Sequence, residues 1–204
     1  MIEYPSIPAD IRRGVSIVAF DKLDGNNLRA EWTLKKGLHK FGTKTRLLGP
    51  DEMPLAKALA MIPERYADLH QRLKKERVQR AVCFFEFWGP QSWFGIQQPD
   101  DDHQVTLIDI ALEKRGIMPP REFMKLTRGL PTAAVLYEGN CNSEFIESVQ
   151  QGTLEGLGPE GVVCKGPFDR KSGKPVMFKV KRHDWYERLR EHCKGNDTLF
   201  KQLA

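Results

Sequence analysis

The sequence predicts an α+β fold of mainly antiparallel sheets flanked by helices. Seven short runs rich in β-branched and aromatic residues are separated by Gly, Pro, Asn and Asp, which is typical of strands joined by turns. Helical periodicity is confined to a few segments, and strands and helices do not alternate regularly as in a doubly wound sheet. The 204 residues contain no long linker, so we expect one domain over residues 1–204, with residues 183–204 as a helical tail.

Strands are expected at residues 15–20, 28–34, 81–88, 105–110, 133–138, 161–165 and 176–181. The first strand is followed by Asp24-Gly25-Asn26-Asn27, whose composition predicts a tight turn into the second strand. Further turns are expected at Gly89-Pro90, Gly139-Asn140 and Gly173-Lys174-Pro175.

Helices are expected where apolar residues recur at helical spacing. Tyr66, Leu69 and Leu73 form one narrow apolar stripe, and Phe145, Ile146 and Val149 mark another helix. Pro119-Pro120 opens a segment that Gly129 ends. Asp184 and Glu187 have the spacing of a capping box, which predicts the start of the C-terminal helix.

Composition points to a soluble protein of a reducing compartment. Hydrophobic residues make up 40% of the chain and charged residues 29%, which is ordinary for a globular domain. No apolar run approaches the ~18 residues of a membrane span, and the N-terminus has no signal-peptide pattern. The four cysteines form no CxxC pair, so we expect buried thiols and a cytoplasmic location, with no membrane partner.

Positive charge is concentrated near the C-terminus. The chain has 32 Lys and Arg against 27 Asp and Glu, a net charge of +5. From Lys165 onward there are 11 basic and five acidic residues, so this part alone has a charge of +6. Such a segment is either a solvated surface or a binding region for a phosphate-rich partner.

Lys22 is the first candidate for chemistry. It follows an apolar strand directly and precedes the polar tract that contains Gly25. A lysine at the end of a buried strand loses hydration, which favours its neutral, nucleophilic form. The alternative is an exposed lysine in a hairpin.

Three further tracts contain charged residues within strands. Glu86 lies in an aromatic run, on the same face as Phe84 and Trp88, and either has a ligand or partner or faces water at a sheet edge. Glu160 and Lys165 flank a short apolar strand. Lys179 and Lys181 share one strand face, which suits a phosphate between them or else a solvated surface.

In this order the tracts resemble the covalent nucleotidyltransferase superfamily, which comprises ATP-dependent DNA and RNA ligases and mRNA capping enzymes. Lys22-Leu23-Asp24-Gly25 is similar to the KxDG motif that contains the family's nucleophile, and Glu86 to the glutamate of its third motif. The tract from Glu160 to Lys165 resembles EGxVxK, and Lys179-Val180-Lys181 resembles KxK. The resemblance covers about residues 16–182 and implies a ligase adenylation domain.

The resemblance also implies a role for each matched residue. Lys22 would attack the α-phosphate of ATP to form lysyl-AMP, and Glu86 would hold the ribose or a metal-bound water. Glu160 would help to place Mg²⁺ or Mn²⁺, while Lys165, Lys179 and Lys181 would neutralise phosphates. The remaining nucleotide-binding candidates are Asp21, Leu23, Asp24, Asn27, Lys44 and Arg46. Of the last two, Lys44 fits the family's basic position slightly better than Arg46.

Within the superfamily, the chain is most similar to the RNA ligase branch typified by the T4 phage RNA ligase 2 group. Asn27 matches an asparagine of that branch, where DNA ligases and capping enzymes usually have arginine. After Lys181 only 23 residues remain, too few for an OB domain. Two positions depart from the pattern: Asp24 replaces a common histidine, and Leu107-Ile108 replace an aromatic that stacks on adenine.

We therefore expect an ATP-dependent RNA ligase that joins a 5′-phosphate end to a 3′-hydroxyl end and serves RNA repair. The alternatives are a minimal ATP-dependent DNA ligase and a non-catalytic nucleic-acid-binding protein that kept the fold.

Overall fold

The computed structural model describes residues 2–169 and 175–203 and confirms an α+β fold with mainly antiparallel sheets. The chain divides into two compact units, each with its own sheet. Unit 1 comprises Met1–Ser6 and Gly25–Ala133, and unit 2 comprises Ile7–Asp24 and Ala134–Ala204. Each unit is therefore assembled from two separate stretches of sequence.

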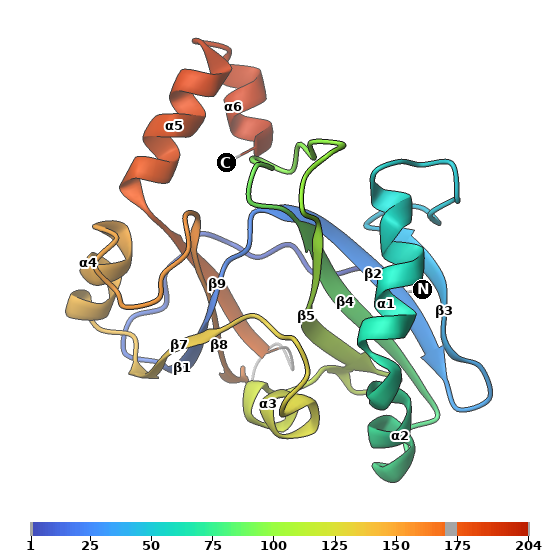
Figure 1. Cartoon of the computed structure of the whole chain (residues 1–204). Helices are drawn as coiled ribbons and strands as arrows, with labels where there is room; N and C mark the ends of the chain where they lie inside the picture. Colours follow the sequence, from blue (N-terminus) through green and yellow to red (C-terminus); the bar gives the residue numbers. More distant parts are fainter. Residues whose placement is uncertain (1, 170–174, 204) are drawn as a thin grey trace. The chain divides into compact units, whose positions relative to one another are not determined.

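Unit 1 contains a five-stranded antiparallel sheet in the order β3-β2-β4-β5-β6 (Figure 1). Its strands are β2 (Gly25–Thr33), β3 (Gly37–Thr43), β4 (Arg80–Trp88), β5 (Gln104–Leu112) and β6 (Gly116–Ile117). Its helices are the short 3₁₀ helix η1 (Leu55–Lys57), α1 (Ala58–Arg65), α2 (Ala67–Lys75) and α3 (Pro120–Thr127).

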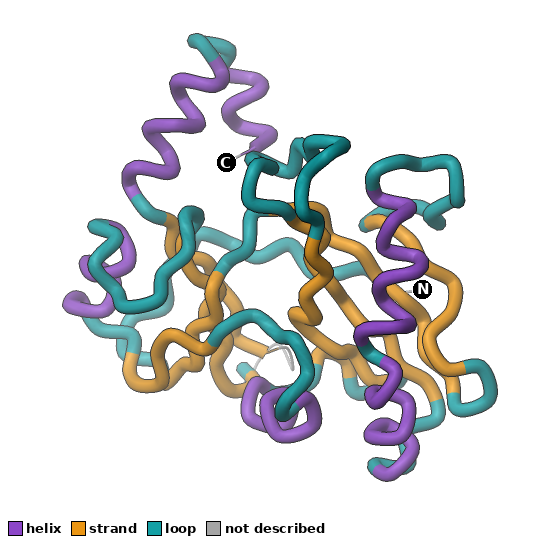
Figure 2. The backbone as a smooth tube through the Cα atoms, viewed as in Figure 1, coloured by secondary structure: helices purple, strands orange, loops and turns teal. Residues whose placement is uncertain are grey.

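One face of this sheet forms the core of unit 1 with the helices. Trp32, Phe85 and Leu107 point to that face and are fully buried with Leu69 and Leu73 of α2. Strand residues alternate between faces, so Glu86 points to the opposite side of the sheet from Phe85. A long loop over residues 89–103 joins β4 to β5 and projects past the end of β4 nearest Glu86 (Figure 2).

Unit 2 contains a four-stranded antiparallel sheet in the order β7-β1-β8-β9. Its strands are β1 (Ser16–Asp21), β7 (Val135–Asn140), β8 (Gly161–Phe168) and β9 (Pro175–Lys181), and its helices are α4 (Ser143–Gln150), α5 (His183–Cys193) and α6 (Asp197–Leu203). Ala19 of β1 and Phe178 of β9 pack in one apolar core with Phe145 and Val149 of α4. β1 lies inside the sheet, which explains its run of four buried residues.

The tight turn predicted at Asp24-Gly25-Asn26-Asn27 is wrong. β1 and β2 belong to different sheets, and Gly25 already begins β2, with Asn26 and Asn27 paired to Phe87 and Glu86. A Cβ at Gly25 would lie 2.3 Å from the Phe87 carbonyl oxygen. The glycine therefore permits close approach of two strands rather than a reversal of the chain.

The capping box predicted at Asp184 and Glu187 is also wrong. The residue that caps α5 is Arg182, and no side chain caps the helix there. Asp184 lies in the first turn, where its carboxylate accepts hydrogen bonds from the Arg182 guanidinium at 2.8 and 2.5 Å. A carboxylate in the first turn still suits the positive end of the helix dipole.

The predicted turn at Gly173-Lys174 lies outside the described residues, and Pro175 begins β9. All four cysteines are buried. Among the described helices, none combines the length and the apolar character that a membrane crossing requires.

Candidate active site

Lys22 lies directly after β1, as the sequence predicts. Its backbone N–H donates to the Gly161 carbonyl at 2.9 Å, and the preceding Asp21 pairs with Val162 of β8. The backbone around Lys22 is thus held against the first residues of β8. This pairing joins two sequence motifs that lie far apart in the chain.

Glu160 bridges two lysines. Its Oε2 accepts a hydrogen bond from Lys22 Nζ at 2.8 Å, and its Oε1 lies 3.0 Å from Lys181 Nζ. The Glu160 and Lys181 side chains are 5% and 2% exposed, whereas Lys22 is 22% exposed. Buried charges are tolerated only when they are paired, so the three groups form one interdependent set. Of these, Lys22 is the group that solvent and a ligand can reach most easily.

The backbone fixes Glu160 at this position. Its carbonyl accepts a hydrogen bond from the Arg182 N–H at 3.1 Å, just beyond β9. The next residue, Gly161, has φ +135°, and a Cβ there would lie 2.2 Å from the Val180 carbonyl oxygen. Only glycine fits at position 161, and this is the structural reason why a glycine follows Glu160.

Lys179 and Lys181 are both held in environments that disfavour their charge. Burial lowers the pKa of Lys181 to about 8; the charge and hydrogen bond of Glu160 oppose this effect, and the charges of Lys22 and Lys179 add smaller lowering contributions. Its ammonium also lies 3.4 Å from the centre of the Trp185 ring. Burial, followed by the charge of Lys22, lowers the pKa of Lys179. The sequence predicts a phosphate beside these lysines. Within the protein, the anion next to Lys181 is the Glu160 carboxylate.

The other unit 2 candidates have structural contacts of their own. Lys165 is buried, with its ammonium 4.5 Å from the centre of the Phe20 ring. Asp21 accepts a hydrogen bond from the Gly158 N–H at 2.9 Å, and burial raises its pKa. Asp24 accepts one from the Trp185 indole at 3.2 Å, while Leu23 is half-buried.

In unit 1, Glu86 and Asn27 are direct cross-strand partners and therefore share one face of the sheet. Among the described residues, the buried Asn27 Oδ1 has no hydrogen-bond partner. A buried acceptor of this kind suits a donor on a ligand, such as a ribose hydroxyl. Leu107 pairs with Phe85 and so points into the core, away from the face of Glu86.

Lys44 and Arg46 lie in the exposed segment after β3. Lys44 Nζ lies 3.4 Å from the Ser6 hydroxyl, and Arg46 forms an ion pair with Glu52. The ammonium of Lys44 is therefore bound more weakly within the protein than the guanidinium of Arg46. The choice between them as a nucleotide ligand stays a prediction.

Sequence reasoning missed that the N-terminal segment lies on the same face as Glu86. The Tyr4 hydroxyl donates to Asp109 Oδ2 at 2.5 Å, and its ring lies 4.9 Å from that of Phe84. Burial and then the charge of Asp109 raise the pKa of Tyr4. Arg29 donates to the Ile2 carbonyl at 3.0 Å. Tyr4 and Asp109 are 105 residues apart, and no local pattern signals their contact.

The basic residues expected to contact RNA after Lys165 are only partly described. Arg170, Lys171 and Lys174 lie outside the described residues. Arg182 is paired with Asp184, Arg188 donates to the Pro159 carbonyl at 3.5 Å, and Arg190 lies 5.7 Å from the centre of the Phe200 ring.

A divalent metal fits Glu160 only together with a phosphate ligand. Within residues 2–169 and 175–203, no group of three or more His, Cys, Asp or Glu side chains could hold a metal. Mg²⁺ commonly uses one or two carboxylates plus the phosphates of its substrate, which matches a site with one carboxylate surrounded by lysines.

Comparison with known proteins identifies the family. The family model described as RNA ligase matches residues 15–181. Among solved structures, a Naegleria gruberi RNA ligase mutant with AMP and Mn has a TM-score of 0.65 at 14% identity, over 92% of this chain and 58% of that chain. Two further mutants of that ligase, both with ATP and Mn, have TM-scores of 0.63 and 0.61 at 17% and 16% identity. Their alignments cover 92% and 86% of this chain and 58% and 52% of theirs.

The chain thus spans between half and three-fifths of the length of these structures. No curated protein matches the sequence. The family match covers most of the chain and includes Lys22, Glu86, Glu160, Lys179 and Lys181. This chain belongs to the RNA ligase family.

Proposed function

We propose that this chain is the adenylyltransferase domain of an ATP-dependent RNA ligase, with Lys22 as its nucleophile. The observation on which the proposal depends is the set of Lys22, Glu160 and Lys181, joined by contacts of 2.8 and 3.0 Å at the end of β1. Membership of the RNA ligase family and the fold shared with ATP- and AMP-bound ligases support it.

The reaction requires Lys22 to lose a proton before it attacks. Glu160 Oε2 already accepts a hydrogen bond from Lys22 Nζ, so it can hold the amine toward the α-phosphate while the ammonium gives up its proton to solvent. The neutral Nζ then forms a bond to the α-phosphorus, the bond from that phosphorus to the α–β bridging oxygen breaks, and pyrophosphate leaves with the bonding electrons. Nζ then loses its second proton to solvent. The product is lysyl-AMP.

The two β9 lysines would neutralise the phosphates. Lys179 and Lys181 lose hydration because they are buried, and this disfavours their charged forms. A phosphate bound beside them would replace the lost water and stabilise both ammonium groups. Bound Mg²⁺ or Mn²⁺ would supply further charge neutralisation on the phosphate oxygens, with Glu160 as its protein ligand. Glu86 and Asn27 of unit 1 would accept hydrogen bonds from the nucleotide.

In the complete reaction we propose that AMP passes to a 5′-phosphate end of RNA, which is then joined to a 3′-hydroxyl end with release of AMP. The alternatives remain a DNA ligase and a non-catalytic protein of the same fold. The ion-paired set of Lys22, Glu160 and Lys181 favours catalysis, because a purely binding protein has no need to keep a lysine and a carboxylate paired in this position.

Mass spectrometry tests the nucleophile. The protein incubated with ATP and Mg²⁺ or Mn²⁺ should gain one AMP, about 329 Da by the chemistry of adenylylation. Lys22→Ala should gain none, and Lys22→Arg should also fail because a guanidinium stays protonated. Lys35→Ala removes an exposed lysine of unit 1 and should behave as wild type. Adenylylation of Lys22→Ala would exclude Lys22 as the nucleophile.

Sealing assays on matched nicked duplexes distinguish the substrates. The protein should seal RNA ends with a terminal 2′-hydroxyl faster than DNA ends of the same sequence. Equal sealing of an all-DNA nick would favour the DNA ligase, and absence of lysyl-AMP altogether would favour the non-catalytic protein.

A further inference from the structure

Unit 1 has a groove that the proposed chemistry does not use. It encloses about 520 Å³ and lies where α2, the end of β5 and α3 meet. This volume is within the ~300–1,000 Å³ range of ligand pockets in proteins. We refer to it below as the α2–α3 groove.

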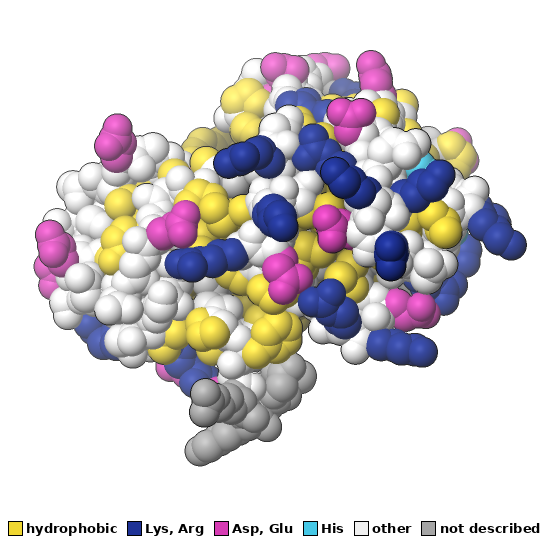
Figure 3. Space-filling model, turned by 90° about the horizontal axis from the view of Figure 1, so that it is seen from below, with side chains coloured by type: hydrophobic (Ala, Val, Ile, Leu, Met, Phe, Trp, Pro, Cys, Tyr) yellow, Lys and Arg dark blue, Asp and Glu magenta, His cyan; other side chains and the backbone are white. Residues whose placement is uncertain are grey.

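The floor of the α2–α3 groove is apolar. Leu112 and Met118 are 7% and 6% exposed, and Val78 and Leu126 are half-buried beside them. Figure 3, which views the molecule from below, shows apolar side chains next to Lys and Arg side chains, with some Asp and Glu side chains between them. An apolar floor of this kind can receive the flat face of a base.

The rim of the groove is mainly cationic. Four basic residues line it, against two acidic residues: Arg72, Lys75, Arg115 and Lys125, with Glu76 and Glu122. Arg115 pairs with Glu122 at 3.1 Å. Within the described part of the chain, no carboxylate forms an ion pair with Lys75 or Lys125. The rim therefore has a net positive charge available to an anion.

The arginine at the base of the rim is fixed in place. Arg72 Nη1 donates to the carbonyls of Leu126 and Arg128 at 3.0 and 2.7 Å, which ties α2 to the end of α3. These acceptors are neutral, so the guanidinium keeps its charge at the rim. The groove is thus built by the fold, and its shape does not depend on the exposed lysines.

The groove lies away from the face of unit 1 that contains Glu86. Leu112 pairs with Ala81, five residues along β4 from Glu86, or about 17 Å at ~3.3 Å per residue. The alternation of strand residues also places Ala81 and Glu86 on opposite faces of the sheet. An occupant of the groove would therefore be separate from a nucleotide held at Glu86.

We infer that the α2–α3 groove binds a single-stranded segment of the RNA substrate. The inference rests on the proposed function for the identity of the polymer. Phosphates suit the lysines and arginines, a base suits the apolar floor, and its exocyclic amino group suits Glu76 or Glu122. The apolar floor beside the cations favours RNA over an acidic peptide, because each nucleotide offers a phosphate and the flat face of a base together.

Binding of a fluorescent single-stranded RNA, followed by anisotropy over a range of salt concentrations, tests the inference. Lys75→Ala/Lys125→Ala removes two rim charges without removing the contacts of Arg72. If both lysines contact phosphates, the slope of log affinity against log salt should become shallower by about 1.4, taking ~0.7 per contact on a single strand. Lys35→Ala/Lys36→Ala, which removes two exposed lysines from the β2–β3 turn, is the matched control and should leave the slope unchanged.

Self-adenylylation separates this inference from the proposed function. Both double variants should form lysyl-AMP at the wild-type rate, because neither alters Lys22 or its partners. An unchanged slope in Lys75→Ala/Lys125→Ala, or an absence of RNA binding by the wild type, would overturn the groove as an RNA site even if lysyl-AMP forms. Displacement of RNA by an acidic peptide of equal charge, at equal concentration, would instead indicate a protein partner. Failure of the wild type to form lysyl-AMP would reject the proposed function and leave the slope comparison as the test of the groove.

Discussion

At the scale of single residues, Lys179 and Lys181 share a strand face but differ in how far they are buried. We expect Lys179→Ala and Lys181→Ala each to slow self-adenylylation by about 10²–10³, the cost of removing one preorganised contact to the transition state. Labelled ATP and denaturing electrophoresis measure this rate. If both variants react at the wild-type rate, the β9 lysines are only a solvated strand face.

Thermal unfolding of the same variants separates the two positions. As a surface lysine, either residue could be truncated at a cost below ~0.5 kcal/mol. Lys181 is not a surface lysine, because its side chain is 2% exposed and pairs with the buried Glu160. Lys181→Ala should therefore lower the free energy of unfolding more than Lys179→Ala, because it leaves Glu160 with Lys22 as its remaining ion-pair partner.

Much of the unit 2 site could be predicted from the sequence, because its residues lie at the ends of recognisable strands. The sequence motifs identified Lys22, Glu160 and Lys181, and the structure brings these three side chains together. The sequence could not predict that Glu160 bridges both lysines, which depends on the pairing of β1 with β8. The contact of Tyr4 with Asp109 was unpredictable for the same reason, since it is purely tertiary.

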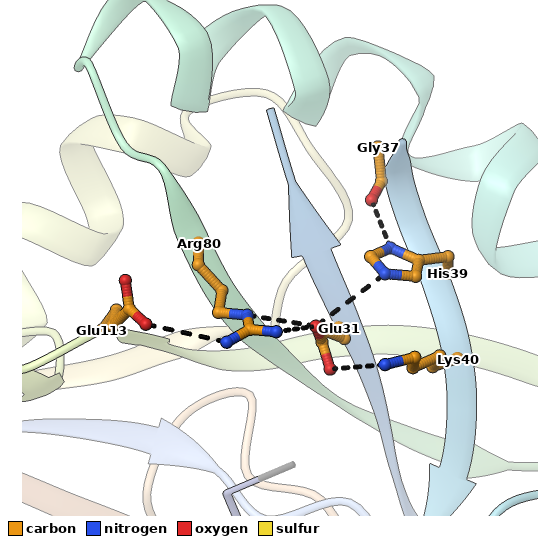
Figure 4. A network of polar contacts seen from close by, with 6 residues as sticks. All are labelled: Glu31, Gly37, His39, Lys40, Arg80 and Glu113. Carbon is orange, nitrogen blue, oxygen red and sulfur yellow. Dashed lines mark hydrogen bonds and ion pairs between the residues drawn. The ribbon is translucent and has the colours of Figure 1, made fainter. Parts of the chain in front are cut away.

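At the scale of elements, the edge of the unit 1 sheet is held by a charge network around Glu31 (Figure 4). Arg80 of β4 donates to Glu31 Oε1 from Nε at 3.1 Å, with Nη2 at 2.9 Å, and His39 and Lys40 of β3 each lie at 3.8 Å from the carboxylate. Burial raises the pKa of Glu31, but the hydrogen bond and charge of Arg80, with Lys40 and His39, outweigh burial and lower it. This carboxylate therefore joins β2, β3 and β4.

Glu31→Gln should reduce the free energy of unfolding at pH 7 by about 1–2 kcal/mol, a modest loss because Arg80 is half exposed. The folded pKa is lower than the unfolded value of about 4.3, so this stability is present above pH 4.3 and is lost as the pH falls through the folded pKa. Denaturant unfolding at pH 7 and at lower pH measures the difference.

Glu113→Gln is the matched control for this network. Glu113 lies 3.7 Å from the same arginine and is itself half exposed, so its loss should change stability little at any pH. A difference between wild type and Glu31→Gln that is the same at acidic and neutral pH would contradict the role given to the Glu31 charge.

The elements that the sequence failed to predict have weak local signals. β3 contains two glycines, a histidine and a lysine in seven residues and is an edge strand, so it shows no clean alternation. α1 contains Pro63, which normally argues against a helix interior. By contrast, α3 begins at Pro120 as predicted, because proline at the first helical position is a local preference.

At the scale of the whole molecule, the basic residues concentrated after Lys165 predict that RNA joining and self-adenylylation respond differently to salt. If about four to six cations contact phosphates, log affinity for RNA should fall with log salt at a slope near −3 to −5, taking ~0.7–0.9 per contact. Lysyl-AMP formation should be less sensitive, because buried groups such as Glu160 and Lys181 are screened less than exposed ones.

Both steps can be followed in one salt titration, with joined RNA and lysyl-AMP quantified from the same samples. Joining should fail at a salt concentration where lysyl-AMP still accumulates. A parallel decline of both would contradict the separation between an exposed RNA surface and a buried reaction site.

The discontinuous path of the chain has a consequence for its synthesis. β1 ends at Asp21, but its partner β8 begins only at Gly161, whereas the main stretch of unit 1 is contiguous over Gly25–Ala133. At translation rates of roughly 5–20 residues per second, Lys22 is synthesised roughly 7–28 s before Glu160. A nascent chain arrested before residue 160 thus presents the lysine without its carboxylate partner. Under the proposed function, the order of residues along the chain would delay the activation of Lys22 until most of the polypeptide has been translated.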